Sequence, residues 1–298
     1  MTVRKLFRHA LAAGLLCVGL VCQAQNQASC TFSLYRLTSG QNDVTRPFGV
    51  NDFNNSVGEL DTEPSPGQFV FRGFIHFSNG GVSLFTAPHS SSTAFRDRSD
   101  SGVNIGNYFD TITQKPQGFV LSGSTFVTIS HPNAPRGTNV YRINKFGSIV
   151  GAWFDSVNSA HGFKLVNKTF LPIMFPNSVE TTPMGINDHG EIVGTYNLSG
   201  GRPQGFTFLN GVYHTVNFPN APTSLKGISN AGTIVGIDLA TESGQSFLRK
   251  SNGVFEFIVV PNAAVTEVTG ISLVNGIITG RAFFNSDGTW HGFTAKCQ

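Results

Sequence analysis

Aromatic, imidazole and carboxylate side chains gather in two short segments of this sequence. One segment contains Trp153, Asp155 and His161, and the other contains Trp290 and His291. An indole ring can stack on the flat face of a sugar while a neighbouring carboxylate accepts hydrogen bonds from the sugar hydroxyls. These residues are therefore candidates for carbohydrate binding. The alternative, and commoner, roles are core packing for Trp153 and a hydrogen bond to the backbone for His161.

The sequence lacks the motifs of the common catalytic and metal sites. It contains neither a G-x-S-x-G nucleophile motif nor an H-E-x-x-H zinc motif. The segment Asn285–Gly288 resembles the start of a calcium-binding loop, but it lacks the later acidic ligands and is typical of a turn. We therefore predict no catalytic residue, no metal site and no cofactor.

The N-terminus has the pattern of a signal peptide. Three basic residues, the last of them Arg8, precede the apolar run Ala10–Val21, and the small residues that follow suit cleavage after Ala24. As a helix this run would rise about 18 Å, too little for a membrane core of about 30 Å. We predict that residues 1–24 are removed, that the protein is secreted (extracellular or periplasmic), and that it has no stable membrane insertion.

Removal of the signal peptide changes the charge balance. The chain has 20 Lys and Arg residues and 17 Asp and Glu residues, and three of the basic residues would leave with the signal. The mature protein then carries no formal net charge. This composition gives no support for nucleic acid or an anionic membrane surface as a partner.

A block of eleven residues recurs along the chain. Its clearest copy is Met184–Gly194, and close copies are Tyr141–Gly151 and Lys226–Gly236. The final glycines of successive copies, three weaker ones included, are 42 to 48 residues apart. That spacing is the length of one β-propeller blade. The weaker copies end at Gly58, Gly106 and Gly280.

Each repeat carries the signals of four strands. After the block comes a Gly-Phe pair, replaced by Ser246 and Phe247 in the fifth copy, then a hairpin turn, and then a proline such as Pro219 that ends a strand. We predict an all-β fold, a six-bladed β-propeller of four-stranded antiparallel blades, in one domain over residues 25–298. The approximate blades are residues 45–89, 90–133, 134–177, 178–220, 221–263 and 264–298, the last completed by residues 30–37.

The two ends of the chain complement each other. The sixth repeat stops after its third strand, while residues 30–37 alternate in the manner of a strand. This strand would complete the last blade and close the ring, whereas a linear solenoid, the competing architecture, needs atypical capping repeats. Cys30 begins this strand and Cys297 ends its partner. Since cysteines of exported proteins are expected to pair, we predict a disulfide here.

The repeat is similar to the HAF family of extracellular repeats, whose signature is roughly G-I-N-x-x-G-x-I-V-G followed by H-x-F. Gly185–Gly194 matches it closely, and the resemblance covers about residues 45–297. The histidine position departs from the signature, because only His161 and His291 occupy it and the other copies have Arg or Gln. This departure argues against one catalytic histidine in every blade. The resemblance implies an exported bacterial repeat protein and no particular activity.

Asp97 and Arg142 stand where the other four repeats have glycine on the innermost strand. We expect this acid and this base of neighbouring blades to meet at the channel, either as a structural ion pair or as a polar contact for a ligand. The sequence as a whole predicts a monomeric binding or scaffold module that presents one face to a glycan or protein ligand. The alternative is a polysaccharide-acting hydrolase or lyase with its site at the central channel.

Overall fold

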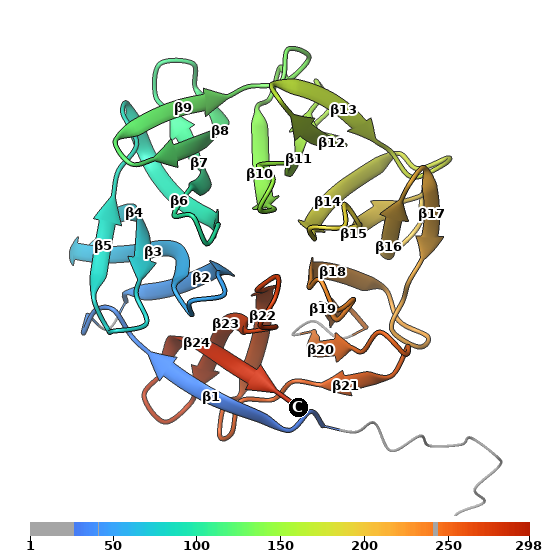
Figure 1. Ribbon diagram of the computed structural model, residues 1–298. Helices are drawn as coiled ribbons and strands as arrows, with labels where there is room; N and C mark the ends of the chain where they lie inside the picture. Colours follow the sequence, from blue (N-terminus) through green and yellow to red (C-terminus); the bar gives the residue numbers. More distant parts are fainter. Residues whose placement is uncertain (1–26, 41, 241–243) are drawn as a thin grey trace, which may run out of the picture.

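The computed structural model describes residues 27–40, 42–240 and 244–298. These residues form 24 β-strands and no helix (Figure 1). The predicted signal peptide, residues 1–24, lies outside the described residues. In the part of the chain that the structure describes, no helix has the length and apolar character that a membrane crossing requires.

The strands pair into antiparallel units of four, as the sequence predicts. Two of the units join into one eight-stranded sheet through a single parallel residue pair, Phe71 with Ser92. We call each antiparallel unit a blade and name it after its first strand. The first two blades contain β2 (Val44–Val50), β3 (Ser56–Ser65), β4 (Gln68–His76) and β5 (Val82–Phe85), and then β6 (Ser90–Arg98), β7 (Asn104–Asp110), β8 (Lys115–Ser122) and β9 (Thr125–Ile129). The next two contain β10 (Thr138–Ile143), β11 (Ile149–Phe154), β12 (Ala160–Val166) and β13 (Thr169–Ile173), and then β14 (Glu180–Ile186), β15 (Ile192–Asn197), β16 (Gln204–Leu209) and β17 (Val212–Thr215). The last two contain β18 (Thr223–Ile228), β19 (Ile234–Asp238), β20 (Gln245–Arg249) and β21 (Phe255–Phe257), and then β22 (Val265–Ile271), β23 (Ile278–Phe284), β24 (Thr289–Cys297) and β1 (Cys30–Tyr35).

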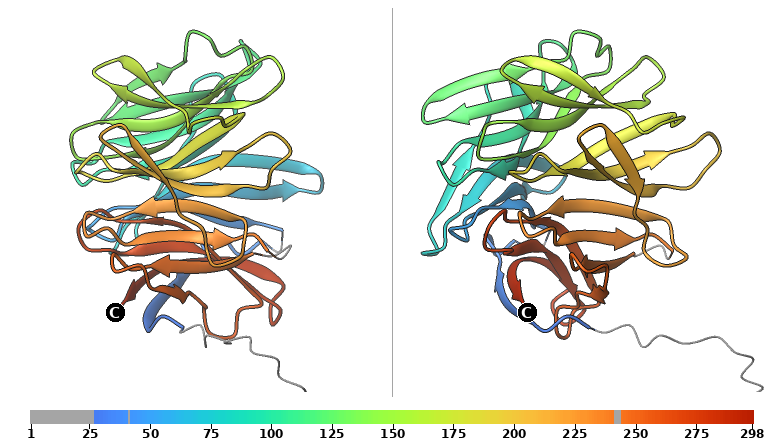
Figure 2. Two further views of the ribbon diagram at one scale, coloured as in Figure 1. Left: turned by 90° about the vertical axis from the view of Figure 1, so that its right-hand side faces the viewer. Right: turned by 45° about the vertical axis from the view of Figure 1, so that its right-hand side comes forward.

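The blades are arranged around a central axis, with the first strand of each blade innermost (Figure 1). Side views show the twisted sheets packed face to face (Figure 2). The hydrophobic clusters lie between neighbouring blades: Val150 of β11, for example, packs with Ile186 and Phe206 of the next blade. The apolar surface of each sheet is therefore buried by the adjacent sheet.

A buried phenylalanine of the third strand lies opposite the last glycine of the repeat block. In the β14 blade, Phe206 pairs with Gly194 and is completely buried. A Cβ atom on Gly194 would collide with the carbonyl oxygen of Thr182 and would lie only 2.9 Å from Cε1 of Phe206. Glycine thus leaves room for the ring, which explains why the two residue types recur together. The same pairing joins Gly58 with Phe74, Gly106 with Phe119, Gly151 with Phe163, Gly236 with Phe247, and Gly280 with Phe293.

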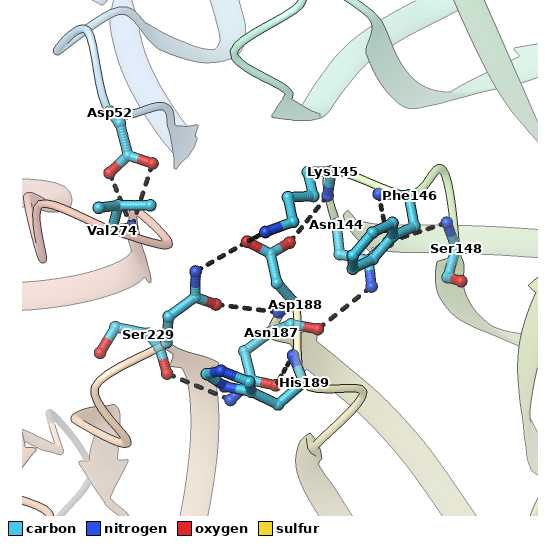
Figure 3. Close-up of polar contacts among 11 residues, drawn as sticks. Asp52, Asn144, Lys145, Phe146, Ser148, Asn187, Asp188, His189, Ser229 and Val274 are labelled. Carbon is cyan, nitrogen blue, oxygen red and sulfur yellow. Dashed lines mark hydrogen bonds and ion pairs between the residues drawn. The ribbon is translucent and has the colours of Figure 1, made fainter.

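The asparagine of the repeat organises the turn between the first and second strands. Oδ1 of Asn187 accepts hydrogen bonds from the backbone N–H groups of His189, at 3.1 Å, and Glu191, at 3.0 Å. The turn requires a positive φ of 82° at Gly190, a conformation that glycine adopts without strain. Asn144 makes the same two bonds in the β10 blade (Figure 3).

The first strand of the chain pairs with the last. β1 lies antiparallel to β24, with Cys30 directly opposite Cys297. The two cysteines form the predicted disulfide, with their Cα atoms 4.0 Å apart. Phe32 of β1 packs edge-on against Phe293, with 5.6 Å between the ring centroids. The two ends of the chain therefore share one sheet, and β2 of the next blade contacts β22, β23 and β24 of this sheet.

Candidate functional site

Each first strand contains a β-bulge where it lines the channel. In β14 the register shifts between Pro183 and Gly185, and equivalent shifts occur in β2, β6, β10, β18 and β22. The residue that ends the bulge is glycine in four strands, Asp97 in β6 and Arg142 in β10. Since a bulge redirects side chains, these positions determine what fills the channel.

Asp97 and Arg142 occupy space that two of the glycines leave free. A Cβ atom on Gly49 would lie 2.7 Å from Oδ1 of Asp97, and a Cβ atom on Gly270 would collide with Nη2 of Arg142. Both charged residues are buried. The predicted pair of channel residues is therefore present, and the short side chain of Asp97 and the long side chain of Arg142 form a layer across the channel.

The polar atoms of this layer bond to the backbone of other blades. Oδ2 of Asp97 accepts a hydrogen bond of 3.0 Å from a backbone N–H of the β10 blade. Nη1 of Arg142 donates to the carbonyl of Arg96 at 2.8 Å. Nη2 of Arg142 donates to the carbonyls of Phe48, at 2.7 Å, and Thr269. The layer thus connects four blades through backbone hydrogen bonds.

Asp97 and Arg142 make no direct ion pair. All ion pairs within 4.0 Å among the described residues involve other side chains. Burial raises the pKa of Asp97, and the positive charge of Arg142 acts in the opposite direction. These contacts favour the structural role for the two residues over a contact with a ligand, although the role is that of a hydrogen-bonded brace and not of an ion pair.

One mouth of the channel is surrounded by the turns that follow the first strands. We call it the turn-side mouth, and its cavity of about 360 Å³ is lined in part by Asp52, Asp100, Lys145 and Asp188. The carboxylates join neighbouring turns (Figure 3). Oδ1 of Asp188 accepts a hydrogen bond from the N–H of Lys145 at 3.0 Å, and Oδ1 of Asp52 accepts one from the N–H of Val274 at 2.9 Å. In the same way, Oδ1 of Asp100 accepts a hydrogen bond from the N–H of Asp52 at 2.9 Å. The acidic groups of this mouth are therefore used in holding the blades together.

The opposite mouth is lined by the extra residue of each bulge. The first strands pass through the layer of Asp97 and Arg142, so residues before and after the bulge lie on opposite sides of that layer. We call this second opening the bulge-side mouth, and its cavity is about 200 Å³. Each of the six first strands contributes its extra bulge residue to it: Phe48, Arg96, Tyr141, Met184, Lys226 and Thr269.

The bulge-side mouth is rich in cationic groups. Cζ of Arg96 lies 4.1 Å from the centroid of the Phe48 ring, and its Nε atom is buried with no hydrogen-bond partner among the described residues. Burial lowers the pKa of Lys226 to about 8, and the charge of Glu267 opposes this shift. Glu267 itself is bound by Arg281, with 2.6 Å between Oε2 and Nε. This mouth therefore offers donors, while the carboxylate at its edge is already paired.

Trp153, Asp155 and His161 come together where β11 and β12 are connected. Nε2 of His161 lies 3.0 Å from Oδ2 of Asp155, and this hydrogen bond lowers the pKa of Asp155. The indole of Trp153 stacks against His161 and against His131, with centroid distances of 4.3 and 5.0 Å. Trp153 also packs against the hydrophobic core. Its indole thus serves packing, while His161 bonds a carboxylate in place of the backbone group considered from the sequence.

Trp290 and His291 lie next to each other in β24 but contact different groups. Cζ of Arg281 is 4.2 Å from the centroid of the Trp290 ring. Nε2 of His291 lies 2.7 Å from Oδ2 of Asp287, and this hydrogen bond is the main reason that the pKa of Asp287 falls to about 2. The β22 blade therefore contains a second His–Asp pair that resembles the one in the β10 blade.

The predicted residues lie in three separate places. The Trp153 group belongs to the β10 blade and the Trp290 group to the β22 blade, and neither lines the cavity of either channel mouth. Within residues 27–40, 42–240 and 244–298, no cluster of His, Cys, Asp or Glu side chains is arranged to hold a metal ion. Arg96 and Lys226 are functional candidates that the motifs of the sequence did not predict. Their position in the repeat could have identified them, because each directly precedes the position at which four of the repeats have a channel-lining glycine.

Comparison with known proteins identifies the fold. No family model and no curated protein matches this chain. Among solved structures, a catalytically inactive variant of virginiamycin B lyase from Staphylococcus aureus with quinupristin gives a TM-score of 0.52 at 10% identity, covering 89% of this chain and 99% of that one. The β-propeller domain of the Trilobed protease from Pyrococcus furiosus gives 0.52 at 8% identity, covering 85% and 96%. The Aleuria aurantia lectin in complex with Fucα1-6GlcNAc gives 0.51 at 10% identity, covering 85% and 94%.

At these identities the likeness shows the fold alone, and this chain is a β-propeller. The three proteins differ widely in what their names describe, since one is a lyase, one is part of a protease and one is a lectin. Function must therefore be argued from the residues of this chain.

Proposed function

We propose that this β-propeller is an exported, non-catalytic binding module that presents its bulge-side face to an extracellular glycan. The observation that carries the proposal is the bulge-side mouth, where the extra bulge residue of every first strand lines a cavity of about 200 Å³. Arg96 and Lys226 bring donors to this cavity. The carboxylates of the turn-side mouth, in contrast, accept backbone N–H groups of neighbouring turns.

The chemical mixture at the bulge-side mouth supports a glycan as the ligand. Arg96, Lys226 and Tyr141 supply polar groups, and Phe48 and Met184 supply apolar surface. Sugars present both hydroxyls and apolar ring faces, so a site for them combines a few polar groups with aromatic or aliphatic walls. The lectin among the structural neighbours is consistent with this use of the fold.

We further infer that the module is a closed ring of six blades, completed by the N-terminal strand. This inference is supported by the pairing of β1 with β24, by the disulfide between Cys30 and Cys297, and by the contacts of β2 with β22, β23 and β24. A closed ring would hold the six side chains of the mouth at constant separations, which preorganises the site. The disulfide fits export to an oxidising compartment, in line with the resemblance to HAF repeats.

Two His–Asp pairs favour a second candidate, a polysaccharide-acting hydrolase or lyase. His161 with Asp155 and His291 with Asp287 are partly exposed pairs at 3.0 and 2.7 Å. A histidine held by a carboxylate can serve as a general base. Since these pairs lie outside both channel cavities, this candidate needs a substrate that reaches the rim of the face.

A binding screen with a product assay separates the two candidates. The mature protein is labelled and applied to an array of plant, fungal and bacterial glycans, and retained glycans are then incubated with it for a long period. Binding with no reducing sugar and no unsaturated product supports the module. Turnover that is abolished by His161→Ala or His291→Ala, with unfolding transitions unchanged, establishes the enzyme, and an array with no retained glycan refutes the glycan-binding proposal.

A further inference from the structure

The cavity of the bulge-side mouth contains more cationic than anionic groups. Arg96, Arg142 and Lys226 line it, and Glu267 is the one carboxylate among its lining residues in the described part of the chain. Glu267 is bound to Arg281, which does not line the cavity. Three cations thus face a cavity whose single carboxylate already has a partner.

Arg96 has unused hydrogen-bonding capacity in this cavity. Its guanidinium is held over the ring of Phe48, its buried Nε has no partner among the described residues, and no carboxylate of these residues lies within ion-pair distance of it. The nearby Glu59 is a weak counter-ion because burial and the charge of Asp61 raise its pKa. An arginine positioned over an aromatic ring can bind a planar carboxylate through two parallel N–H···O bonds.

Lys226 adds a second positive charge at the same opening. Burial is the main reason that its pKa is lowered, and the charges of Arg142 and Arg96 lower it further, while Glu267 opposes them. Cations that share one cavity repel each other, and an anion placed among them reverses that effect. The electrostatics of the mouth therefore favour an anionic ligand over a neutral one.

The size of the cavity limits what part of a ligand it can hold. Its volume of about 200 Å³ is below the range of roughly 300–1,000 Å³ that is typical for drug-sized ligands. It suits one sugar ring or the acidic end of a longer chain. Phe48 and Met184 offer apolar walls to ring carbons, and Tyr141 offers a hydroxyl.

We propose that the bulge-side mouth binds the carboxylate of an acidic sugar at an end or branch of an extracellular glycan. Arg96 forms paired hydrogen bonds with the carboxylate, Lys226 supplies the second charge, and Arg142 contributes its charge from the floor of the cavity while its hydrogen bonds remain on backbone carbonyls. This inference rests on the proposed glycan-binding function and adds the charge of the sugar that the site selects.

A matched pair of monosaccharides tests the carboxylate. Methyl β-D-glucuronide and methyl β-D-glucoside differ only at C6, which is a carboxylate in the first and a hydroxymethyl group in the second. We expect the glucuronide to bind the intact mature protein roughly tenfold or more tightly in an NMR titration, because a charge-assisted hydrogen bond is stronger than a neutral one. Acetate is titrated in parallel to distinguish a free small acid from the sugar-borne group, and we expect it to bind more weakly than the glucuronide.

Variants of the mouth connect the selectivity to its residues. Arg96→Gln and, separately, Lys226→Met should each reduce the affinity for glucuronide roughly tenfold or more and leave the weak affinity for glucoside unchanged. Arg202→Gln is the matched control, since Arg202 is an exposed arginine in the loop between β15 and β16 and does not line the cavity. Thermal unfolding of all three variants shows whether they remain folded, and two independent variants keep the test valid if one of them does not.

The outcomes distinguish this inference from the proposed function. The acidic-sugar assignment is overturned if glucuronide and glucoside bind equally, or if acetate and glucuronide bind equally. It is also overturned if both mouth variants still prefer glucuronide over glucoside. If neutral glycans on the array bind at the same time, the glycan-binding function still stands. If neither glycoside nor any arrayed glycan binds, both proposals are wrong.

Discussion

Removal of the disulfide between Cys30 and Cys297 should destabilise the protein strongly, because it links the two ends of the described chain. The perturbation is the double variant Cys30→Ser with Cys297→Ser, which leaves the pairing of β1 with β24 available but frees the ends of the unfolded chain. The bond spans a sequence separation of 267 residues. Since the bond restricts mainly the unfolded state, its effect is expected to grow with this separation.

The magnitude follows from the entropy of closing that loop. For a separation of 267 residues, the chain-entropy relation gives about 19 cal/mol/K, or about 5.6 kcal/mol at 25 °C. Measured losses for native disulfides are commonly about 2–5 kcal/mol. We therefore expect the free energy of unfolding to fall by about 2–5 kcal/mol, with the chain-entropy value as the upper limit.

Guanidinium chloride unfolding followed by tryptophan fluorescence measures this loss. Trp153 and Trp290 lie in different blades, so the signal reports on two parts of the structure. Ser33→Ala is the matched control, because Ser33 is an exposed residue of β1 whose substitution leaves the disulfide intact. Hydrogen exchange of the β1 amides shows whether the strand opens locally in the double variant.

A loss below about 1 kcal/mol, together with unchanged protection of the β1 amides, would refute this reasoning. Such a result would mean either that the unfolded chain stays compact without the disulfide, or that the pairing of β1 with β24 contributes little to the stability of the protein. An equal loss in the Ser33→Ala control would refute it as well, because the effect would then belong to the strand and not to the covalent link.

Three further outcomes are expected from the core and the channel. Arg142→Met should lower the free energy of unfolding by about 3 kcal/mol, because buried carbonyls of other blades lose their hydrogen-bond donor. Denaturant titration measures this loss, and an unchanged free energy of unfolding would contradict the bracing role of Arg142. Gly194→Ala should lower the free energy of unfolding by about 1–3 kcal/mol, since the new methyl group meets the Thr182 carbonyl and the Phe206 ring. Gly81→Ala is the comparison, because Gly81 is exposed, has no positive φ, and a methyl group there would meet only side-chain atoms of Asn79 and Phe77. The pKa of Lys226 is about 8 in the folded protein and about 10.5 for an ordinary lysine. Between these two pH values the folded protein therefore binds fewer protons than the unfolded chain, and the free energy of unfolding rises with pH. Lys226→Met should remove that rise, and an identical pH profile of variant and parent would show that Lys226 does not titrate in this window.

Much of the blade could be predicted from the repeat because its rules are local. The glycine at the end of the block and the phenylalanine of the third strand recur together since the ring of Phe206 occupies the space beside Gly194. The Asn-x-x-Gly turn recurs since the Asn187 side chain accepts two backbone N–H groups of the same turn. Such contacts join residues that are close in sequence or one strand apart, so a period of 42 to 48 residues contains them in full.

The candidate site could be predicted only in part. The position in the repeat placed Asp97 and Arg142 in the channel. Three of the four carbonyls that Arg142 binds, however, belong to residues 46, 94 and 127 positions away. The sequence also placed Trp153 beside His161, yet gave no sign that His131, from the connection before β10, would stack against the same indole. Each of these partners comes from another blade or from a connecting segment.

The sequence by itself determined the strands, the turns, the pairing of the chain ends and the disulfide, because each depends on a local pattern or on a missing strand. Only the tertiary structure decided which polar groups have hydrogen-bond partners within the protein and which have none among the described residues. That distinction separates the bonded Asp97 from Arg96, whose Nε has no partner among the described residues. Its physical reason is that hydrogen-bonding capacity is satisfied across blades, by backbone groups whose positions depend on how the sheets pack around the axis.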